Sequence, residues 1–285
     1  MNAPRILSVA GSGPIKRLGI ALILFIAVHA SLAAGGTEEE TVSTTPARAE
    51  ATTAEDAADG GVPIELTIRE GEHFEHKLKI MPLVRVKNHP QMAVWCETTE
   101  GEFIATLFIT ESIATQSWRS APGDSTPKEE IRRVESLPAW SHRHGNVYAD
   151  GAPLPTDEEP MPDAVTAATP TTGFRIETRL PPGDGSVVVY VEVNNSADFN
   201  DAYPKDAVVG TPGYSGGPWG SGQPALVYAA EVDRARLASG SPTTLECIGH
   251  SSPDGSSGEI NRDLTGVTTA AQILDEVEIG PRSSR

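Results

Sequence analysis

The 285-residue chain has few cysteines, few aromatic residues and few basic residues, and each shortage excludes a class of protein. Two cysteines are too few for a disulfide-rich scaffold. Aromatic residues make up 5%, which with 27 Gly and 23 Pro favours a turn-rich chain over a helical bundle. Lys and Arg number 22 against 39 Asp and Glu, a formal net charge of −17. We therefore expect no nucleic-acid partner, and the charge also argues against a peripheral protein held on anionic lipid.

The amino terminus has the pattern of a secretory signal. Two basic residues precede the apolar run Leu18–Val28, and small residues follow at Ser31 and Ala33. Because the run is shorter than the roughly 20 apolar residues that a membrane span prefers, we expect cleavage after Ala33 and not an uncleaved anchor. The sequence thus predicts a signal peptide over residues 1–33 and a periplasmic or secreted protein with no stable membrane span after cleavage.

The rest of the chain divides into a linker and one domain. Residues 34–61 are rich in Glu, Thr and Ala with almost no large apolar residue, which predicts a disordered linker. Residues 62–285 are predicted to form a single domain, in which short stretches of alternating apolar and polar residues recur between turn signals. The predicted strands are Pro63–Arg69, Phe74–Ile80, Gln91–Glu97, Glu102–Thr110, Gly173–Leu180, Ser186–Asn194, Ala225–Asp233, Thr243–Gly249 and Ile273–Ile279.

These strands have no long amphipathic helices between them. Thr99–Gly101 and Pro182–Gly185 have the composition of turns that join the strands of hairpins. The predicted fold class is therefore all-β: an antiparallel, immunoglobulin-like β-sandwich with two long loops.

The two long loops are Glu111–Pro162 and Asn194–Pro224, and they contain three of the four tryptophans, Trp118, Trp140 and Trp219. Loops of this length in compact domains tend to be functional or disordered, and aromatic side chains favour burial. We predict that both loops pack at one end of the sandwich and form a binding surface. The alternative is that the tryptophans only anchor the loops to the sheet.

The two cysteines, Cys96 and Cys247, lie in predicted strands. The alternation of each strand places the thiol on the apolar side, as a bridge between two sheets would require. Two separate buried thiols would give the same pattern. The sequence leaves both alternatives open.

The strongest candidate for a cofactor site lies at residues 162–170, PDAVTAATP. The pattern D-x-x-T-A-A-T resembles the D-x-x-[ST]-G-A-[ST] motif on which ApbE-type flavin transferases attach FMN, through a phosphoester to the last hydroxyl. Asp163, Thr166 and Thr169 match this motif, whereas Ala167 stands where the motif has Gly. The resemblance implies cofactor-binding residues Asp163, Thr166 and Thr169, with covalent FMN on Thr169. The alternative is a tight turn stabilised by the Asp163 side chain.

The wider order of motifs is similar to that of an uncharacterised, DUF-type family of bacterial exported β-domain proteins. The residues concerned are Ala93–Trp95, the D-x-x-T motif, Val191–Asn194 and Ser221–Tyr228. Members of that family are encoded near PepSY-type membrane reductases and ApbE-type flavin transferases. The resemblance implies a periplasmic setting and a redox role in partnership with a membrane reductase or another envelope protein.

A second, weaker candidate site is the H-x-H pair His142 and His144. On a strand, residues two apart point to the same face and can share a metal ion. The alternative is an exposed loop with two solvated histidines.

The sequence contains no G-x-S-x-G elbow, P-loop or H-E-x-x-H motif, so no catalytic residue is predicted. Two functions are favoured, ahead of a third, weaker one, a metal-dependent hydrolase built on His142 and His144. One is an exported, non-catalytic β-sandwich domain that binds an envelope partner through its long aromatic loops. The other is an extracytosolic electron-transfer protein that carries covalent FMN on Thr169 and works with a membrane reductase.

Overall fold

The computed structural model describes residues 47–48, 61–81, 84–116, 118, 125, 131–156, 158–159, 161, 166–167 and 174–282. The predicted signal peptide (1–33) lies outside the described residues, and of the predicted linker (34–61) they include Ala47–Arg48 and Gly61. None of the helices among the described residues is long and apolar enough to cross a membrane.

Strands dominate the described part of the chain. The strands are β1 (Ala47–Arg48), β2 (Val62–Glu70), β3 (His76–Met81), β4 (Val84–Asn88), β5 (Gln91–Glu97), β6 (Phe103–Thr110), β7 (Thr166–Ala167), β8 (Phe174–Leu180), β9 (Ser186–Asn194), β10 (Leu226–Asp233), β11 (Thr243–Thr244), β12 (Glu246–His250) and β13 (Leu274–Pro281). The helices are short: α1 (Glu111–Ala114), α2 (Pro138–Arg143), α3 (Arg234–Ala238) and the 3₁₀ turns η2 (Gly217–Trp219) and η3 (Thr269–Gln272).

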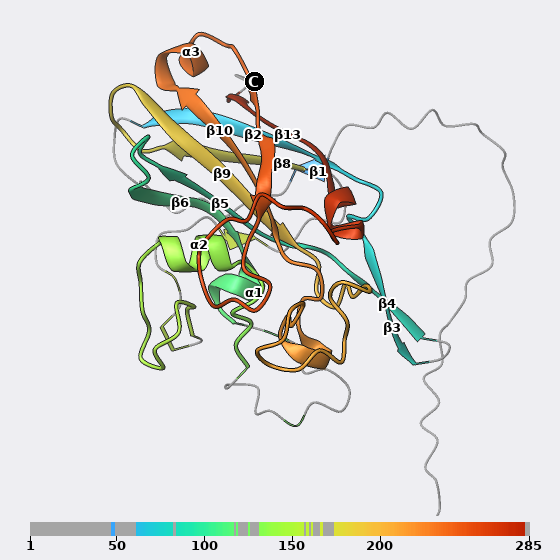
Figure 1. The fold of residues 1–285 in the computed structure, drawn as a ribbon. Helices are drawn as coiled ribbons and strands as arrows, with labels where there is room; N and C mark the ends of the chain where they lie inside the picture. The colour runs from blue at the N-terminus through green and yellow to red at the C-terminus, as the bar shows by residue number, and fades with distance from the viewer. Residues whose placement is uncertain are drawn as a thin grey trace, which may run out of the picture. The chain divides into compact units, whose positions relative to one another are not determined.

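The strands form two large sheets and one separate hairpin (Figure 1). The five-stranded sheet has the order β1-β8-β2-β13-β11, and the six-stranded sheet has the order β12-β10-β9-β5-β6-β7. Neighbouring strands are antiparallel except for the two-residue contacts β1–β8 and β6–β7. The all-β sandwich predicted from the sequence is therefore confirmed, while its immunoglobulin-like character remains a prediction.

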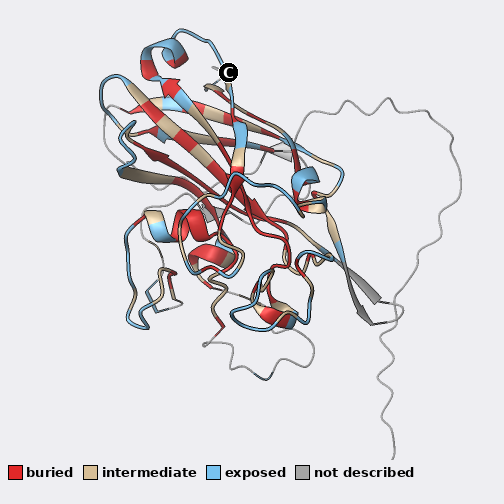
Figure 2. Ribbon diagram, in the orientation of Figure 1, coloured by how far each residue is buried: buried red, intermediate tan, exposed pale blue. Residues whose placement is uncertain are grey.

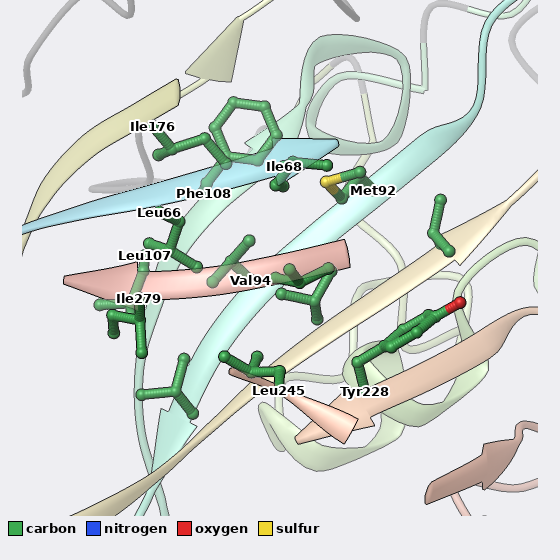
Figure 3. Packing of buried hydrophobic residues seen from close by; sticks show 14 of the residues in the cluster. Leu66, Ile68, Met92, Val94, Leu107, Phe108, Ile176, Tyr228, Leu245 and Ile279 are labelled. Carbon is green, nitrogen blue, oxygen red and sulfur yellow. The ribbon is translucent and has the colours of Figure 1, made fainter. Parts of the chain in front are cut away.

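The main core lies between the two sheets and follows from the period of two in the strands. In β2, Ile64, Leu66 and Ile68 alternate with more exposed residues and are at most 1% exposed. Residues of β5, β6, β9 and β10 meet them from the other sheet, and Figure 3 shows Met92, Val94 and Phe108 in this cluster.

The described strands match most of the predicted ones closely. β5 and β9 have the predicted bounds, and β2, β6, β8, β10 and β13 differ from theirs by one or two residues at an end. β4 was not predicted. It lies between prolines at positions 82 and 90, and proline interrupts the pattern by which a strand is recognised. The Thr99–Gly101 turn joins β5 to β6 as predicted.

The prediction of a hairpin at Pro182–Gly185 is wrong. β8 pairs with β2 in the five-stranded sheet, whereas β9 pairs with β5 and β10 in the six-stranded sheet. The turn therefore carries the chain from one sheet to the other. A turn composition indicates a reversal of direction, but it does not specify which sheet the next strand joins.

The predicted strand Thr243–Gly249 is two strands, β11 and β12, because the chain changes sheet at this point too. β11 pairs with β13, the Leu245 amide donates to the Val277 carbonyl (2.9 Å), and β12 then pairs with β10 in the other sheet. The change of sheet interrupts the alternation, so Leu245 is buried and Cys247 is exposed. The prediction that both thiols face the apolar side is wrong for Cys247. Both cysteines are free, with Cys96 buried in the main core.

The six-stranded sheet is covered on its outer face as well. Every residue of β5 is buried, because Met92, Val94 and Cys96 face the main core while Ala93 and Trp95 face a second cluster. The helices of the first long loop supply much of this second core, as the buried α1 and α2 in Figure 2 show. We call this cluster the outer core; its buried members are Ala93, Trp95, Ile109, Ile113, Ala114, Leu137, Ala139, Trp140, Leu154, Ala225 and Val227.

Candidate functional site

The two long loops leave the six-stranded sheet at one end, as predicted. Gln91 at the start of β5 pairs with Asn194 at the end of β9, and Leu226 at the start of β10 pairs with Val193. β6 ends beside them at Thr110, whose hydroxyl donates to Gln91 Oε1 (2.8 Å). In Figure 1, α1, α2 and the irregular segment before β10 lie together at this end. The loops are thus brought together by the register of the sheet.

The first loop is attached to the sheet by a buried carboxylate. Glu192 of β9 is fully buried and accepts hydrogen bonds from the backbone amides of Ala139 (3.1 Å) and Trp140 (2.8 Å) in the first turn of α2. These are two of the amides that a helix N-terminus leaves without a partner. Burial raises the pKa of Glu192 to about 7, with the two amide donors, the Ser251 hydroxyl and Arg143 acting in the opposite direction.

A second buried carboxylate joins the other end of α2 to the sheet. Glu97 is fully buried, and its carboxylate oxygens accept from Arg143 Nη1 (both 3.1 Å) and from Trp95 Nε1 (2.8 Å). The Tyr190 ring stacks on Trp95 at 4.9 Å, and the Arg143 guanidinium lies 5.7 Å from the Tyr190 ring centre. Both oxygens of Glu97 are already hydrogen-bonded in a closed cluster, so this carboxylate serves to hold α2 in place.

A third carboxyl lies where the two long loops meet. Glu135 is 3% exposed, and its backbone carbonyl accepts from the Ser221 hydroxyl of the second loop (3.3 Å). Its carboxyl lies against Gly216, where an added Cβ would collide with it and where φ is +89°. Burial raises the pKa of Glu135 to about 7. Gly216 is therefore required here both for its left-handed backbone and for the close contact with Glu135.

The base of the second loop is a buried hydrogen-bond network. Asp198 is 5% exposed and accepts from Thr269 Oγ1 (2.7 and 2.8 Å) and from Gln223 Nε2 (2.8 Å). Gln223 Oε1 accepts from the Thr268 backbone N–H (2.6 Å), and the Gln223 backbone N–H donates to the Asp198 backbone carbonyl (2.9 Å). These contacts join the two ends of the loop to the segment before β13, so the loop stands on a fixed base.

The tip of the second loop, by contrast, exposes apolar side chains. Val208 is 67% exposed and Val209 is 74% exposed. Tyr214 and Trp219 are half-buried nearby in the sequence, and Lys205 Nζ lies 5.0 Å from the centre of the Trp219 ring. We call these five residues the loop tip. These two adjacent, strongly exposed valines on an ordered base are the candidate contact of this loop with another molecule.

Some aromatic residues of the loops anchor the loops to the sheet, and others remain partly exposed, as a binding surface would require. Trp140 is fully buried in the outer core, where its Nε1 donates to Thr106 Oγ1 (3.0 Å), and Tyr203 is 8% exposed. These two anchor the loops. Trp118 and Trp219 are half-buried, so they leave part of each ring at the surface.

The histidine pair does not have the strand geometry on which the metal prediction depended. His142 lies on α2 and His144 caps its C-terminus, and positions two apart on a helix are separated by about 200°. His142 Nε2 donates to the Gly255 carbonyl (2.9 Å), whereas His144 Nε2 donates to the Pro153 carbonyl (3.0 Å) and its Nδ1 accepts from the Asn146 amide (3.0 Å). Burial lowers the pKa of His144, which favours this neutral ring.

The described residues contain no group of three or more His, Cys, Asp or Glu placed to hold a metal ion. They do include a pocket of about 420 Å³ at the end of β12, lined by His250, Ser251, Ser252, Pro253, Ser257, Glu259, Ile260 and Asn261. His250 Nδ1 donates to the Ser251 carbonyl (2.7 Å), and the Ser251 hydroxyl donates to the Ala225 carbonyl (3.4 Å). The histidine and the hydroxyl thus engage backbone groups and do not form a nucleophile–base pair.

The flavin motif is described only in part. Thr166 and Ala167 form β7, which pairs in parallel with Ile109 and Thr110 at the edge of the six-stranded sheet. Asp163 and Thr169 lie outside the described residues. Of the three predicted cofactor-binding residues, the described part of the chain thus includes Thr166 alone, on the outermost strand of the six-stranded sheet.

The sequence analysis missed the three buried carboxyls Glu97, Glu135 and Glu192. One signal was present in the strands themselves. Trp95 and Tyr190 lie on the face of their strands opposite the main core, where a solvated sheet would carry polar residues. Large aromatic residues on that face indicate a covering layer, and acids beside them are then expected to be buried and paired.

Comparison with known proteins finds no matching family model, no matching curated protein and no matching solved structure. The family resemblance described from the sequence is therefore a prediction, and the function is argued from the residues alone.

Proposed function

We propose that this chain is an exported, non-catalytic β-sandwich domain that binds another component of the cell envelope through its second long loop. The observation that carries the proposal is the loop tip, where Val208 and Val209 are 67% and 74% exposed above a buried, hydrogen-bonded base. Periplasmic or secreted localisation rests on the signal-like amino terminus.

The construction of this loop suits binding. Its ends are joined by Asp198, Gln223 and Thr269, so little conformational entropy is lost when a partner orders the tip. Half-buried Tyr214 and Trp219 follow in the same loop, and partly exposed aromatic side chains are frequent anchors in protein interfaces.

The buried acids support a non-catalytic reading. Glu97 and Glu192 are each 0% exposed, and their oxygens accept hydrogen bonds that fix the two ends of α2. A general acid or base must reach a proton on its substrate. Carboxyls that are covered by the outer core do not meet this condition, although the raised pKa of Glu192 alone would mark that residue as a candidate.

The proposal is tested by photo-crosslinking in cells. With a photoreactive amino acid at Val208, we expect one discrete adduct in the envelope fraction and a mature N-terminus at Ala34. Adding Val209→Asp is expected to reduce the adduct at least about tenfold, because a charge would be buried in the contact. Thermal unfolding is expected to stay within about 0.5 kcal/mol of the parent, as at other exposed sites.

The matched control places the same photoreactive residue at Val147, which is 71% exposed in the first long loop. Identical adducts from positions 147 and 208, or an adduct that survives Val209→Asp, would show that the loop tip is not a specific contact. A chain recovered from the cytosol with its original N-terminus would contradict export.

The alternative function is electron transfer with FMN on Thr169, working with a membrane reductase. The observation that favours it is the place of β7 on the edge of the six-stranded sheet, because a transferase must take the motif into its own active site. The FMN would be joined through a phosphoester to the Thr169 hydroxyl.

This alternative predicts a covalent product. Co-expression with an ApbE-type flavin transferase is expected to give a denatured chain that fluoresces in the gel and has gained the mass of one FMN. Thr169→Ala is expected to abolish the gain, and Thr172→Ala, which alters a nearby hydroxyl outside the motif, is expected to keep it. An unmodified chain under these conditions would contradict the electron-transfer function, and only the binding function would remain.

A further inference from the structure

The segment at the end of β12 forms a closed loop, residues 250–261, which we call the serine loop. His250 and Asn261 face each other at its two ends, and the backbone N–H of each donates to the backbone carbonyl of the other (both 2.8 Å). The middle of the loop is fixed as well, because the Gly255 carbonyl accepts from His142 Nε2 (2.9 Å) and the Gly255 backbone packs against that of Val134. Compact surface loops with joined ends are frequently functional.

The serine loop supplies every residue that lines the pocket of about 420 Å³. Pockets that bind small molecules typically measure about 300–1,000 Å³. A bare metal ion would fill little of this space, and the described part of the chain places no three His, Cys, Asp or Glu side chains together to hold one. The pocket therefore suits a small organic molecule better than an ion.

His250 presents an unused hydrogen-bond acceptor to this pocket. The residue is 4% exposed, and its Nδ1 donates to the Ser251 carbonyl (2.7 Å), so in the neutral ring Nε2 carries the lone pair. Among the described residues, none makes a hydrogen bond with this Nε2. The nitrogen is not sealed from solvent, and His250 lines the pocket. The partner of Nε2 must therefore enter from the pocket.

The other side chains of the pocket also favour a ligand that donates hydrogen bonds. The Ser251 hydroxyl donates to a backbone carbonyl (3.4 Å), and the Ser252 hydroxyl donates to the Asp254 carboxylate (2.5 Å), so both protons are already used within the chain. The ionised Glu259 carboxylate can only accept. None of the described residues that line the pocket is a Lys or an Arg.

The charge around the pocket favours a cation. Residues 250–263 contain three acids, Asp254, Glu259 and Asp263, against one basic residue, Arg262, in a chain whose net charge is −17. An acidic surround raises the local concentration of cations and disfavours anions. A ligand that is both cationic and rich in N–H donors matches the pocket on both counts.

We propose that the serine loop binds a small organic cation through a primary ammonium group, which donates to His250 Nε2 and to the Glu259 carboxylate. This site lies outside the loop tip, and the proposal does not depend on the binding function of the second long loop. A free amine and a lysine side chain of another protein carry the same ammonium group, so the test includes a probe for each.

The test is calorimetric titration of the full chain with cadaverine (1,5-diaminopentane) and with its neutral analogue 1,5-pentanediol. We expect saturable one-to-one binding of cadaverine, at least about tenfold tighter than that of the diol, because charge-assisted hydrogen bonds are about twice as strong as neutral ones. Equal affinity for the two probes, or no saturable binding of cadaverine, would overturn the proposal. Nα-acetyl-lysine methylamide identifies the source of the ammonium group: tighter binding than cadaverine supports a protein lysine, and weaker binding supports a free amine.

A matched pair of variants tests the place of the site. Glu259→Gln keeps the size of an exposed side chain and removes its charge, and it is expected to weaken cadaverine binding at least about tenfold. Glu246→Gln makes the same change at an exposed position of β12 outside the pocket, and it is expected to weaken binding less than about twofold. Equal losses from the two variants would show attraction to the net charge alone and would overturn the proposal.

His250 is tested without substitution, because a change at so buried a residue can disturb the fold. In a chain labelled with ¹⁵N-histidine, the Nε2 resonance of His250 is expected to shift when cadaverine binds. The Nε2 resonance of His144, which donates to the Pro153 carbonyl, is expected to stay in place. An unmoved His250 resonance with cadaverine bound would overturn the proposal, and so would a shift caused by Zn²⁺ but not by cadaverine, since that result indicates a metal site.

Discussion

Replacing Trp140 with alanine is expected to lower the free energy of unfolding by about 3–5 kcal/mol, the usual cost of truncating a large buried aromatic side chain. The indole is fully buried in the outer core, lies 4.7 Å from the His144 ring, and donates from Nε1 to Thr106. Its removal leaves a cavity between α2 and the sheet and an unpaired hydroxyl. Chemical denaturation followed by far-UV circular dichroism measures the loss.

The same substitution at Trp219 is the matched control. Trp219 is half-buried in the loop tip, where its main described contact is with Lys205 at 5.0 Å, so Trp219→Ala is expected to cost about 1 kcal/mol or less. Equal losses at the two positions would contradict the assignment of Trp140 to a second core. A small loss at Trp140 with α2 still in place would show that this helix is held by Glu97 and Glu192 alone.

Stability is expected to decrease as the pH rises from about 4.5 to about 7. Burial raises the pKa values of Glu135 and Glu192 to about 7 from an ordinary 4.5, so between these limits the folded chain holds protons that the unfolded chain has released. Their stabilising contribution is therefore fully present below pH 4.5 and is lost as the pH rises through 7. The slope is about 1.4 kcal/mol per pH unit for each carboxyl that remains protonated.

Glu135→Gln isolates one of these groups. The variant keeps the size of the side chain but cannot ionise, so its stability is expected to decrease less steeply between pH 4.5 and 7 than that of the parent. His144 acts in the opposite direction, because its lowered pKa favours the folded state as the pH rises toward 6.5. Urea denaturation at half-unit steps of pH measures both curves. A parent curve that rises through this range, or a variant with an unchanged slope, would contradict the prediction.

The period of two in the strands allowed most of the fold to be predicted. One example is the row of buried valines on β9, at positions 187, 189, 191 and 193. Such a row can be predicted from the local sequence alone, without knowing which distant residues pack on it. What the pattern could not give is the choice of sheet for each strand. The Pro182–Gly185 turn and Leu245 both carry the chain between sheets, and that choice depends on which strands, far away in sequence, are free to pair.

The candidate site was less predictable, for a similar reason. The loops could be recognised by length and by their tryptophans, but the burial of Trp140 depends on Glu192, which lies 52 residues away and accepts from its amide. His142 and His144 were read as a strand, whereas Pro138 begins a short helix. Short helices held by tertiary contacts carry little periodic signal of their own.

The pairing of β2 with β13 sets the order in which this domain can fold. The two strands are neighbours in the sheet although about 200 residues separate them in the sequence. Ile64 pairs with Pro281, and β13 lies between β2 and β11 in the five-stranded sheet. A chain still emerging from a ribosome therefore lacks an interior strand of the five-stranded sheet until β13 has left the ribosome. Up to that moment the apolar faces of β2 and β8 have no complete sheet to join, so a nascent chain would depend on chaperones to avoid aggregation.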